Sequence, residues 1–149
     1  MEDANVTAAV VISFSETLED SSSEFYQELA NRWPKHEGQF LAFARDCERS
    51  KANVIRTYQE TISDALDAGY SFKGLQLEEF RPDTALPIDV SYADALTMAL
   101  ALEGTAIAFY QTVAEQASLL ATIPRAFRGT AKRRSRRKKE LEALLAEVT

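Results

Sequence analysis

Two glutamates of this chain stand in matching local contexts, one in each half. Glu19 precedes a Phe-Tyr pair at 25–26 by six residues, and Glu103 precedes a second such pair at 109–110 by the same six. Carboxylates can hold a hard divalent cation or pair with an arginine. The equal spacing predicts a duplicated helical hairpin with one glutamate in each copy.

Two arginines interrupt an apolar stripe in the last thirty residues. Arg134 and Arg137 follow the three- and four-residue spacing of that stripe. Charges are rarely buried without a partner, because desolvation costs several kcal/mol per ion. A guanidinium group can bind a carboxylate through two parallel hydrogen bonds. We therefore predict that Arg134 and Arg137 pair with Glu19 and Glu103 across the interior.

The only cysteine, Cys47, lies on another inward stripe, and Lys51 follows it four residues later. A single cysteine excludes a disulfide within the chain and a CxxC metal module. The first interpretation of Cys47 is a small, buried hydrophobic residue. The alternative is a reactive thiolate whose pKa is lowered by Lys51, Arg134 or Arg137.

Four stretches have the helical period that would position these side chains. Their ends carry suitable residues: Trp33-Pro34 after the first stretch, Gly69 after the second, Ser91 before the third and Pro124 in the first turn of the fourth. Asn5 or Thr7 can cap the first stretch. We predict helices at about 7–31, 37–68, 91–121 and 124–147.

The second and third predicted helices are joined by a long connection, residues 69–90, which we predict to be non-helical. Gly74, Pro82 and Pro87 fall within it. A connection of about twenty residues is unusual between neighbours in a compact domain. One long crossover between helices 2 and 3 is the ferritin-like arrangement. The predicted fold is thus all-α, a single domain over residues 1–149 with an up-down-down-up four-helix bundle.

Composition fits a globular protein, with 46% hydrophobic and 27% charged residues. No apolar run approaches the roughly 20 residues that span a bilayer, so we expect no membrane contact. The acidic start of the chain is unlike a secretory signal, and the single cysteine suits a reducing compartment. We expect a cytoplasmic protein.

The net charge of −6 conceals a strong asymmetry. Residues 1–124 contain 8 Lys/Arg and 20 Asp/Glu, whereas residues 125–149 contain 9 Lys/Arg and 3 Glu. Such a basic block indicates an internal charge partner or an anionic ligand. We expect Arg133, Arg136 and Lys139 to face solvent. Nucleic-acid binding is disfavoured, because the block lacks aromatic residues for base stacking and the rest of the chain is acidic.

These features together resemble the rubrerythrin-like branch of the ferritin-like superfamily over about residues 7–148. In that family, the first and third helices carry a Glu six residues before a Phe-Tyr pair, and Glu19 and Glu103 match those metal-ligand positions. The second and fourth helices carry Phe-x-x-Leu-Ala-x-x-Glu-x-x-His. The chain follows this frame from Phe40 and again from Phe127.

The ligands of the second and fourth helices are absent from that frame. Cys47 and Ser50 stand where the family has Glu and His in the second helix, and Arg134 and Arg137 stand there in the fourth. A di-iron site needs a Glu from two helices and a Glu-x-x-His from each of the other two. The resemblance therefore implies a degenerate di-iron site, with no cofactor or metal expected and guanidinium groups in place of the ions.

Tyr26 and Tyr110 stand where tyrosines approach the metal site in the family. In the absence of a metal, we interpret them as core residues whose hydroxyls could hydrogen-bond to Glu19 and Glu103. Tyr26, Tyr110 and Lys51 are the residues that we expect to line the site.

The resemblance and the missing ligands predict a non-catalytic scaffold or interaction protein, and bundles of this type that pair through helix faces imply a homodimer. One alternative is a metal-binding oxidoreductase with a remodelled site. In it, Glu19, Glu103 and Cys47 would hold iron or another divalent metal, or a small organic ligand would fill the space. A second alternative is anion or nucleic-acid binding through the basic fourth helix.

Overall fold

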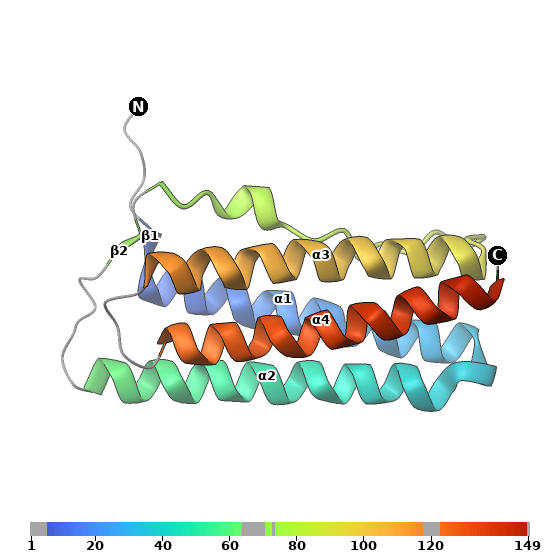
Figure 1. Cartoon of the computed structure of the whole chain (residues 1–149), viewed down its shortest axis with the longest axis horizontal. Helices are drawn as coiled ribbons and strands as arrows, with labels where there is room; N and C mark the ends of the chain where they lie inside the picture. Colours follow the sequence, from blue (N-terminus) through green and yellow to red (C-terminus); the bar gives the residue numbers. More distant parts are fainter. Residues whose placement is uncertain (1–5, 64–70, 73, 118–122, 149) are drawn as a thin grey trace.

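A computed structural model of the chain describes residues 6–63, 71–72, 74–117 and 123–148, and in this part the chain is a bundle of four long helices. They are α1 (Ala8–Arg32), α2 (Glu37–Ser63), α3 (Tyr92–Gln116) and α4 (Ile123–Val148). Figure 1 shows that α1 and α4 run in one direction, and α2 and α3 in the other. The all-α prediction is confirmed. Within the described residues, no helix has the length and apolar character needed to cross a membrane.

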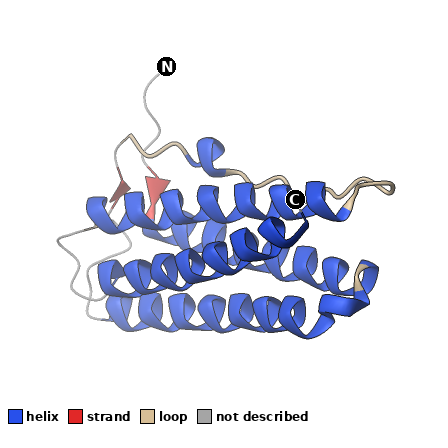
Figure 2. Ribbon diagram, turned by 45° about the vertical axis from the view of Figure 1, so that its right-hand side comes forward, coloured by secondary structure: helices blue, strands red, loops and turns tan. Residues whose placement is uncertain are grey.

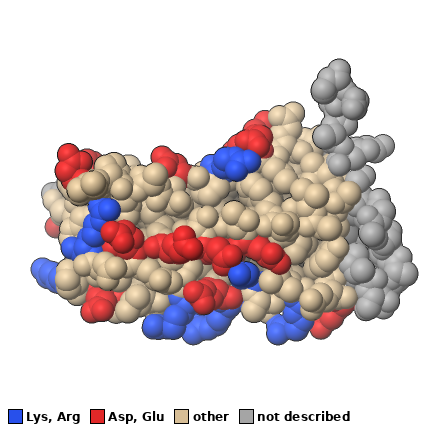
Figure 3. Space-filling model, turned by 180° about the vertical axis from the view of Figure 1, so that it is seen from behind, with Lys and Arg blue, Asp and Glu red and all other residues tan. Residues whose placement is uncertain are grey.

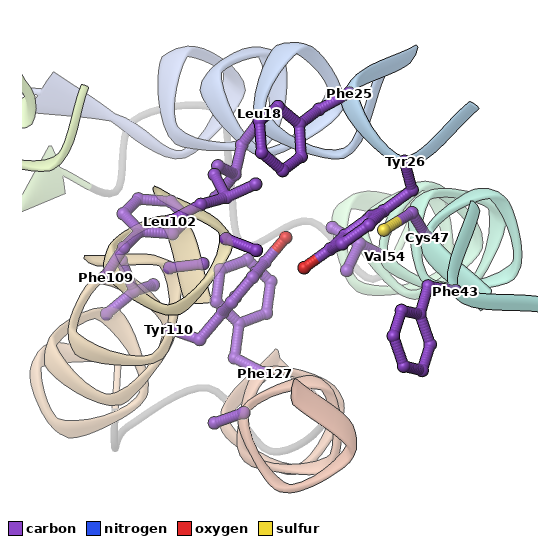
Figure 4. Close-up of a cluster of buried hydrophobic side chains, with 14 of the residues drawn as sticks. Leu18, Phe25, Tyr26, Phe43, Cys47, Val54, Leu102, Phe109, Tyr110 and Phe127 are labelled. Atoms are coloured by element: carbon purple, nitrogen blue, oxygen red, sulfur yellow. The ribbon is translucent and has the colours of Figure 1, made fainter. Parts of the chain in front are cut away.

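The helices pack as two antiparallel hairpins, α1 with α2 and α3 with α4. Further contacts join α2 to α4 and α1 to α3, so that α1 and α4 lie on opposite corners of the bundle. The end-on view of Figure 4 shows this arrangement, with side chains from all four helices directed to the centre. Residues from both hairpins, among them Tyr26, Phe40, Leu102 and Phe127, are fully or almost fully buried there.

Local chemistry explains most helix ends. The side chain of Thr7 accepts a hydrogen bond from the backbone N–H of Val10, and that of Ser91 accepts one from the N–H of Asp94. Trp33, before Pro34, is the C-cap of α1, and Pro124 lies in the first turn of α4, as predicted.

The third helix ends at Gln116, earlier than predicted, because Ala117 is its C-cap in a non-helical conformation. The predicted end at 121, Asn5 as a cap, residues 64–68 of the predicted second helix and its Gly69 stop lie outside the described residues.

The crossover has more structure than the sequence predicts. A short strand β2 (Ser71–Phe72) pairs antiparallel with β1 (Val6–Thr7), just before α1. A 3-10 helix, η2 (Leu77–Phe80), follows, so the prediction of a wholly non-helical connection is wrong at these four residues. Figure 2 shows the crossover running along the outside of α3. The ring of Phe80 contacts that of Phe109 with centroids 5.8 Å apart, which ties η2 to α3.

Candidate functional site

Four charged side chains meet in the middle of the bundle. Glu19 comes from α1, Glu103 from α3, and Arg134 and Arg137 from α4; each is at most 2% exposed. We call these four residues the buried cluster. Its formal charges sum to zero, which is the condition for burying so many ions. Cys47 of α2 lies against the cluster and is also fully buried.

Arg134 joins the two glutamates. Its guanidinium binds Glu19 through two nitrogens, Nη2 at 2.9 Å from Oε1 and Nε at 3.3 Å from Oε2. Nη1 donates to Oε1 of Glu103 at 2.9 Å. Nη2 also donates to the hydroxyl of Ser22 at 2.9 Å, and that hydroxyl donates in turn to the carbonyl oxygen of Leu18 at 2.7 Å. All three nitrogens of this buried guanidinium therefore have acceptors, as a desolvated charge requires.

Arg137 links the cluster to the edge of the bundle. Its Nη1 donates to both oxygens of Glu103, at 3.2 and 3.4 Å, and its Nη2 donates to Asp46 at 2.9 Å. The side chain of Asp46 is 29% exposed, so this carboxylate lies at the border with solvent. The guanidinium carbon lies 5.7 Å from the ring centroid of Tyr26 and 5.8 Å from that of Phe43, within the range of cation–π attraction.

The two tyrosines cross the bundle reciprocally. Tyr26 of α1 donates to Glu103 of α3, and Tyr110 of α3 donates to Glu19 of α1. Figure 4 shows the two hydroxyls pointing toward one another near the bundle centre. Ser15 lies 2.8 Å from the Tyr110 hydroxyl and donates to it, because Tyr110 has only one proton and gives it to Glu19. Each hairpin thus carries a glutamate and a tyrosine that pair with those of the other.

Burial and pairing set the ionisation of these groups. Burial raises the pKa of Tyr26 and Tyr110, and the adjacent carboxylates raise it further, so both tyrosines stay protonated. Burial alone would lower the pKa of Arg134 and Arg137, but the negative charge of Glu103 raises it above the ordinary arginine value. Burial would also raise the pKa of Glu103, yet Arg134 and Arg137 together hold it below its ordinary value. Glu103, Arg134 and Arg137 are therefore charged at neutral pH.

Cys47 is a buried, protonated thiol. Its Sγ lies 3.4 Å from Nη1 of Arg137 and 4.0 Å from Nη2 of Arg134, so it accepts from both guanidinium groups. Burial raises the pKa of the thiol to about 12, and this effect outweighs the two arginines, which act in the opposite direction. Of the two interpretations of Cys47, this geometry favours the buried hydrophobic residue over the reactive thiolate.

The pairings predicted from sequence are largely found. Arg134 binds both glutamates, Arg137 binds Glu103 and not Glu19, and both tyrosine hydroxyls bind glutamates.

Two residues lie elsewhere than predicted. Lys51 does not line the cluster, since its ammonium group pairs with Asp20 at 2.9 Å on the surface. Arg133 is not fully solvated, because its Nη2 donates to Thr130 at 3.1 Å and to buried Ser50 at 3.3 Å.

Ser15, Ser22 and Asp46 are members of the site that the sequence analysis did not identify. The two serines lie on the inward stripe of α1, where hydroxyls among apolar residues indicate buried acceptors or donors. Asp46 directly precedes Cys47 in the sequence. Only the orientation of α2 about its own axis, seen in the structure, shows that the Asp46 carboxylate reaches Arg137. The serine positions could have been found from sequence, and Asp46 could not.

The described side chains do not form a cation site. No group of three or more His, Cys, Asp or Glu in the described residues is arranged to hold a metal ion. Guanidinium nitrogens, which are donors only, lie between the two buried glutamates. Together with the tyrosine hydroxyls, they donate to all four carboxylate oxygens. The arrangement neutralises the carboxylates and joins α1, α3 and α4.

Comparison with protein-family models, with curated proteins and with solved structures finds no match to this chain.

Replacing Arg134 by methionine should lower the free energy of unfolding by about 3–5 kcal/mol, because Glu19 then remains buried without its cation. Adding Glu19→Gln to Arg134→Met should recover much of this loss, since Arg137 still pairs with Glu103. Urea unfolding at pH 7 measures both effects. Arg136→Met, which changes an exposed arginine on the same helix, is the matched control and should alter stability by less than about 0.5 kcal/mol. A double variant no more stable than Arg134→Met would contradict the charge-balance explanation.

Stability should depend on the ionisation of Glu103 at acid pH. Its folded-state pKa is below the ordinary value of 4.5, so its charge stabilises the fold fully above that pH. The stabilisation is lost as pH falls through the lower, folded-state pKa. The stability difference between the native chain and Glu103→Gln should therefore be constant near neutral pH and shrink in acid. Urea titrations between about pH 7 and 3 test this, and a constant difference throughout would refute it.

Iodoacetamide should alkylate Cys47 at least about 100-fold more slowly in the folded protein than in denaturant, because the thiol is buried and protonated. Mass spectrometry follows the reaction. A control chain with Cys47→Ala and Ser13→Cys places one thiol at an exposed position of α1 and should react quickly when folded. Equal rates for the two folded proteins would restore the reactive-thiolate interpretation.

Proposed function

We propose that this protein is a non-catalytic, metal-free relative of the rubrerythrin-like bundles, acting as a scaffold or interaction protein. The observation that carries the proposal is the position of Arg134, whose guanidinium lies between Glu19 and Glu103 and binds both. In the proposed ancestry these glutamates are remnant metal ligands, and the arginines supply the positive charge of the lost ions. The ferritin-like topology is part of the same proposal, supported by the helix directions and the long crossover.

The spatial arrangement supports the proposed register with the family motif. Cys47, Arg134 and Arg137 stand at family ligand positions in the sequence, and their side chains converge on the two glutamates. Ser50, the fourth replaced position, is buried but directed to Arg133. A slip of α4 by one turn would not bring both arginines to the glutamates. Residues four positions apart share a face of a helix, but they lie about 6 Å from each other along its axis.

Such a cluster suits a structural role. It connects α1 and α3 to α4 directly and reaches α2 through Asp46, so each helix has a charged partner at a defined height. Breaking one member of a buried ionic network leaves an uncompensated charge, which disfavours alternative packings of the helices. A rigid bundle with a defined surface is what a scaffold or binding partner requires. Homodimerisation remains a prediction of the resemblance, and a cytoplasmic location remains a prediction from the sequence.

An oxidoreductase with a remodelled metal site is the less supported function. It would need ligands where guanidinium groups now donate hydrogen bonds to the glutamates, and Cys47 is a protonated thiol among them. A hard divalent cation would have to displace two charged, hydrogen-bonded arginines.

Metal analysis tests the proposal directly. Protein purified from iron-supplemented cells should contain no stoichiometric iron, whereas two tightly bound irons per chain would overturn the proposal. The variant Cys47→Glu/Ser50→His/Arg134→Glu/Arg137→His restores Glu-x-x-His on α2 and α4 and should bind about two Co²⁺ per chain, detected by absorption spectroscopy. A control with Gln in place of both introduced glutamates should bind markedly less. Failure of the folded, restored variant to bind metal would count against the family register.

A further inference from the structure

The outer face of α4 carries a straight row of cations. Arg125, Arg128, Lys132, Arg136 and Lys139 recur at three- and four-residue steps, and all five are exposed. We call these five residues the basic ridge. At 1.5 Å per residue the ridge is about 21 Å long. It lies on the side of α4 opposite to Arg134 and Arg137, which point into the bundle.

The ridge has no anionic partner within the described part of the chain. The ion pairs found there involve Arg32, Arg49, Lys51, Arg81, Arg134 and Arg137, and none involves a ridge residue. Within the basic block, Arg134 and Arg137 therefore have anionic partners inside the bundle. The ridge residues have none in the described part of the chain, so their charge faces the solvent.

The outer face of α1 carries the complementary row. Glu16, Asp20, Glu24 and Glu28 recur at steps of four residues over about 18 Å of helix, and we call them the acidic stripe. Figure 3, the view from behind, shows acidic side chains in a continuous row along this face. Asp20 pairs with Lys51 and Glu28 with Arg32, yet these two acidic side chains remain 51% and 44% exposed.

The two rows are on opposite faces of the bundle. α1 and α4 lie on opposite corners, as Figure 4 shows end-on, and they face each other inward through Glu19 and Arg134. Their outer faces therefore point in opposite directions. A copy that binds the ridge of one molecule with its own stripe leaves its ridge free for the next. A closed two-fold pair cannot bring both ridges onto both stripes at once.

Open grooves flank the ridge and would receive a neighbour's side chains. One groove, between α3 and α4, is lined by Gln111, Glu115, Arg128, Lys132 and Ser135. The other, between α2 and α4, is lined by Arg49, Arg133, Arg136 and Glu140, among others. Each groove contains ridge cations without an anionic partner in the described residues, Arg128 and Lys132 in the first and Arg136 in the second, beside one or more carboxylates of its own.

We infer that the basic ridge of one copy docks along the acidic stripe of a second copy, giving a head-to-tail assembly. The two rows are similar in length and helical spacing, and their charges are opposite in sign. Exposed ion pairs are individually weak, so the assembly is reversible and depends on ionic strength. A second copy fits better than a nucleic acid, because the ridge has no aromatic residue and the chain is acidic as a whole. This inference goes beyond the proposed function and does not depend on the metal content of the cluster.

Sedimentation velocity of the full chain at about 100 μM provides the first test. Charges separated by water interact over about 10 Å at 0.1 M salt and only about 3 Å at 1 M. The weight-average mass should be at least about twice that of the monomer at about 30 mM salt and fall to the monomer value near 1 M. A monomer at both ionic strengths would overturn the inference, as would a dimer that salt does not dissociate.

A pair of one-sided variants gives the decisive test. Arg128→Gln/Lys132→Gln/Arg136→Gln removes the ridge, and Asp20→Asn/Glu24→Gln/Glu28→Gln removes the stripe. Each variant alone should be monomeric at low salt, because each retains one docking face without its complement. Mixed in equal amounts, they should form a 1:1 dimer and nothing larger, since the stripe of the first meets the ridge of the second and both outer ends are blocked.

Matched controls change the same net charge elsewhere. Arg45→Gln/Arg56→Gln/Arg81→Gln and Glu37→Gln/Glu79→Gln/Glu142→Gln alter exposed residues outside the two rows and should assemble like the native chain. Circular dichroism confirms folding of all variants. If the controls dissociate as fully as the one-sided variants, or if the mixture stays monomeric, the docking is refuted. A monomeric chain whose ridge binds an oligonucleotide in low salt would also refute it and identify a polyanion as the partner.

Discussion

Two guanidinium groups lie in the centre of a bundle whose other interior residues are mostly apolar. Moving such ions out of water costs several kcal/mol each, so the fold is stable only where opposite charges and hydrogen-bond acceptors meet them. Glu19 and Glu103 supply the charge, and Ser22 and Asp46 supply further acceptors. These acceptors belong to α1, α2 and α3. The three helices must therefore pack so that all the acceptors reach the two arginines of α4. The position of each helix is in this sense a consequence of neutralising Arg134 and Arg137.

The reciprocal tyrosine–glutamate pairs relate this charge balance to the architecture. Tyr26 binds the glutamate of the second hairpin, and Tyr110 binds the glutamate of the first. Each hairpin thus completes the polar site of the other, as expected for two copies of one helical unit facing each other across a common centre. The facing arrangement makes α2 and α3 run in the same direction, and the chain must then return over the full length of the bundle. The long crossover along α3 meets this geometric requirement.

The basic residues of the fourth helix have two roles. Arginines on its inner side are desolvated and paired, and they hold the bundle together. The basic ridge on its outer side is exposed and has no ion-pair partner in the described part of the chain, so its field extends into the solvent and is available to another molecule. The same division holds in α1, where Glu19 points inward and the acidic stripe outward. The charge asymmetry of the sequence therefore becomes a polarity across the bundle, with a negative face on α1 and a positive face on α4.

The sequence by itself determined the presence of four helices, several of their caps and the class of interaction at the centre. Helical period and capping act over a few residues, and a charge on an inward stripe must find an opposite charge, so these features follow from local pattern and electrostatics. Tertiary structure decided the remaining partners, which the sequence pattern did not identify. The partner of a long side chain depends on which groups the packing of the helices brings within its reach. Lys51 pairs with Asp20 on the surface, Arg133 donates to Ser50, and Arg137 binds Asp46 and not Glu19. The pairing of β1 with β2 and the docking of η2 on α3 likewise depend on contacts between residues distant in sequence, which no local pattern encodes.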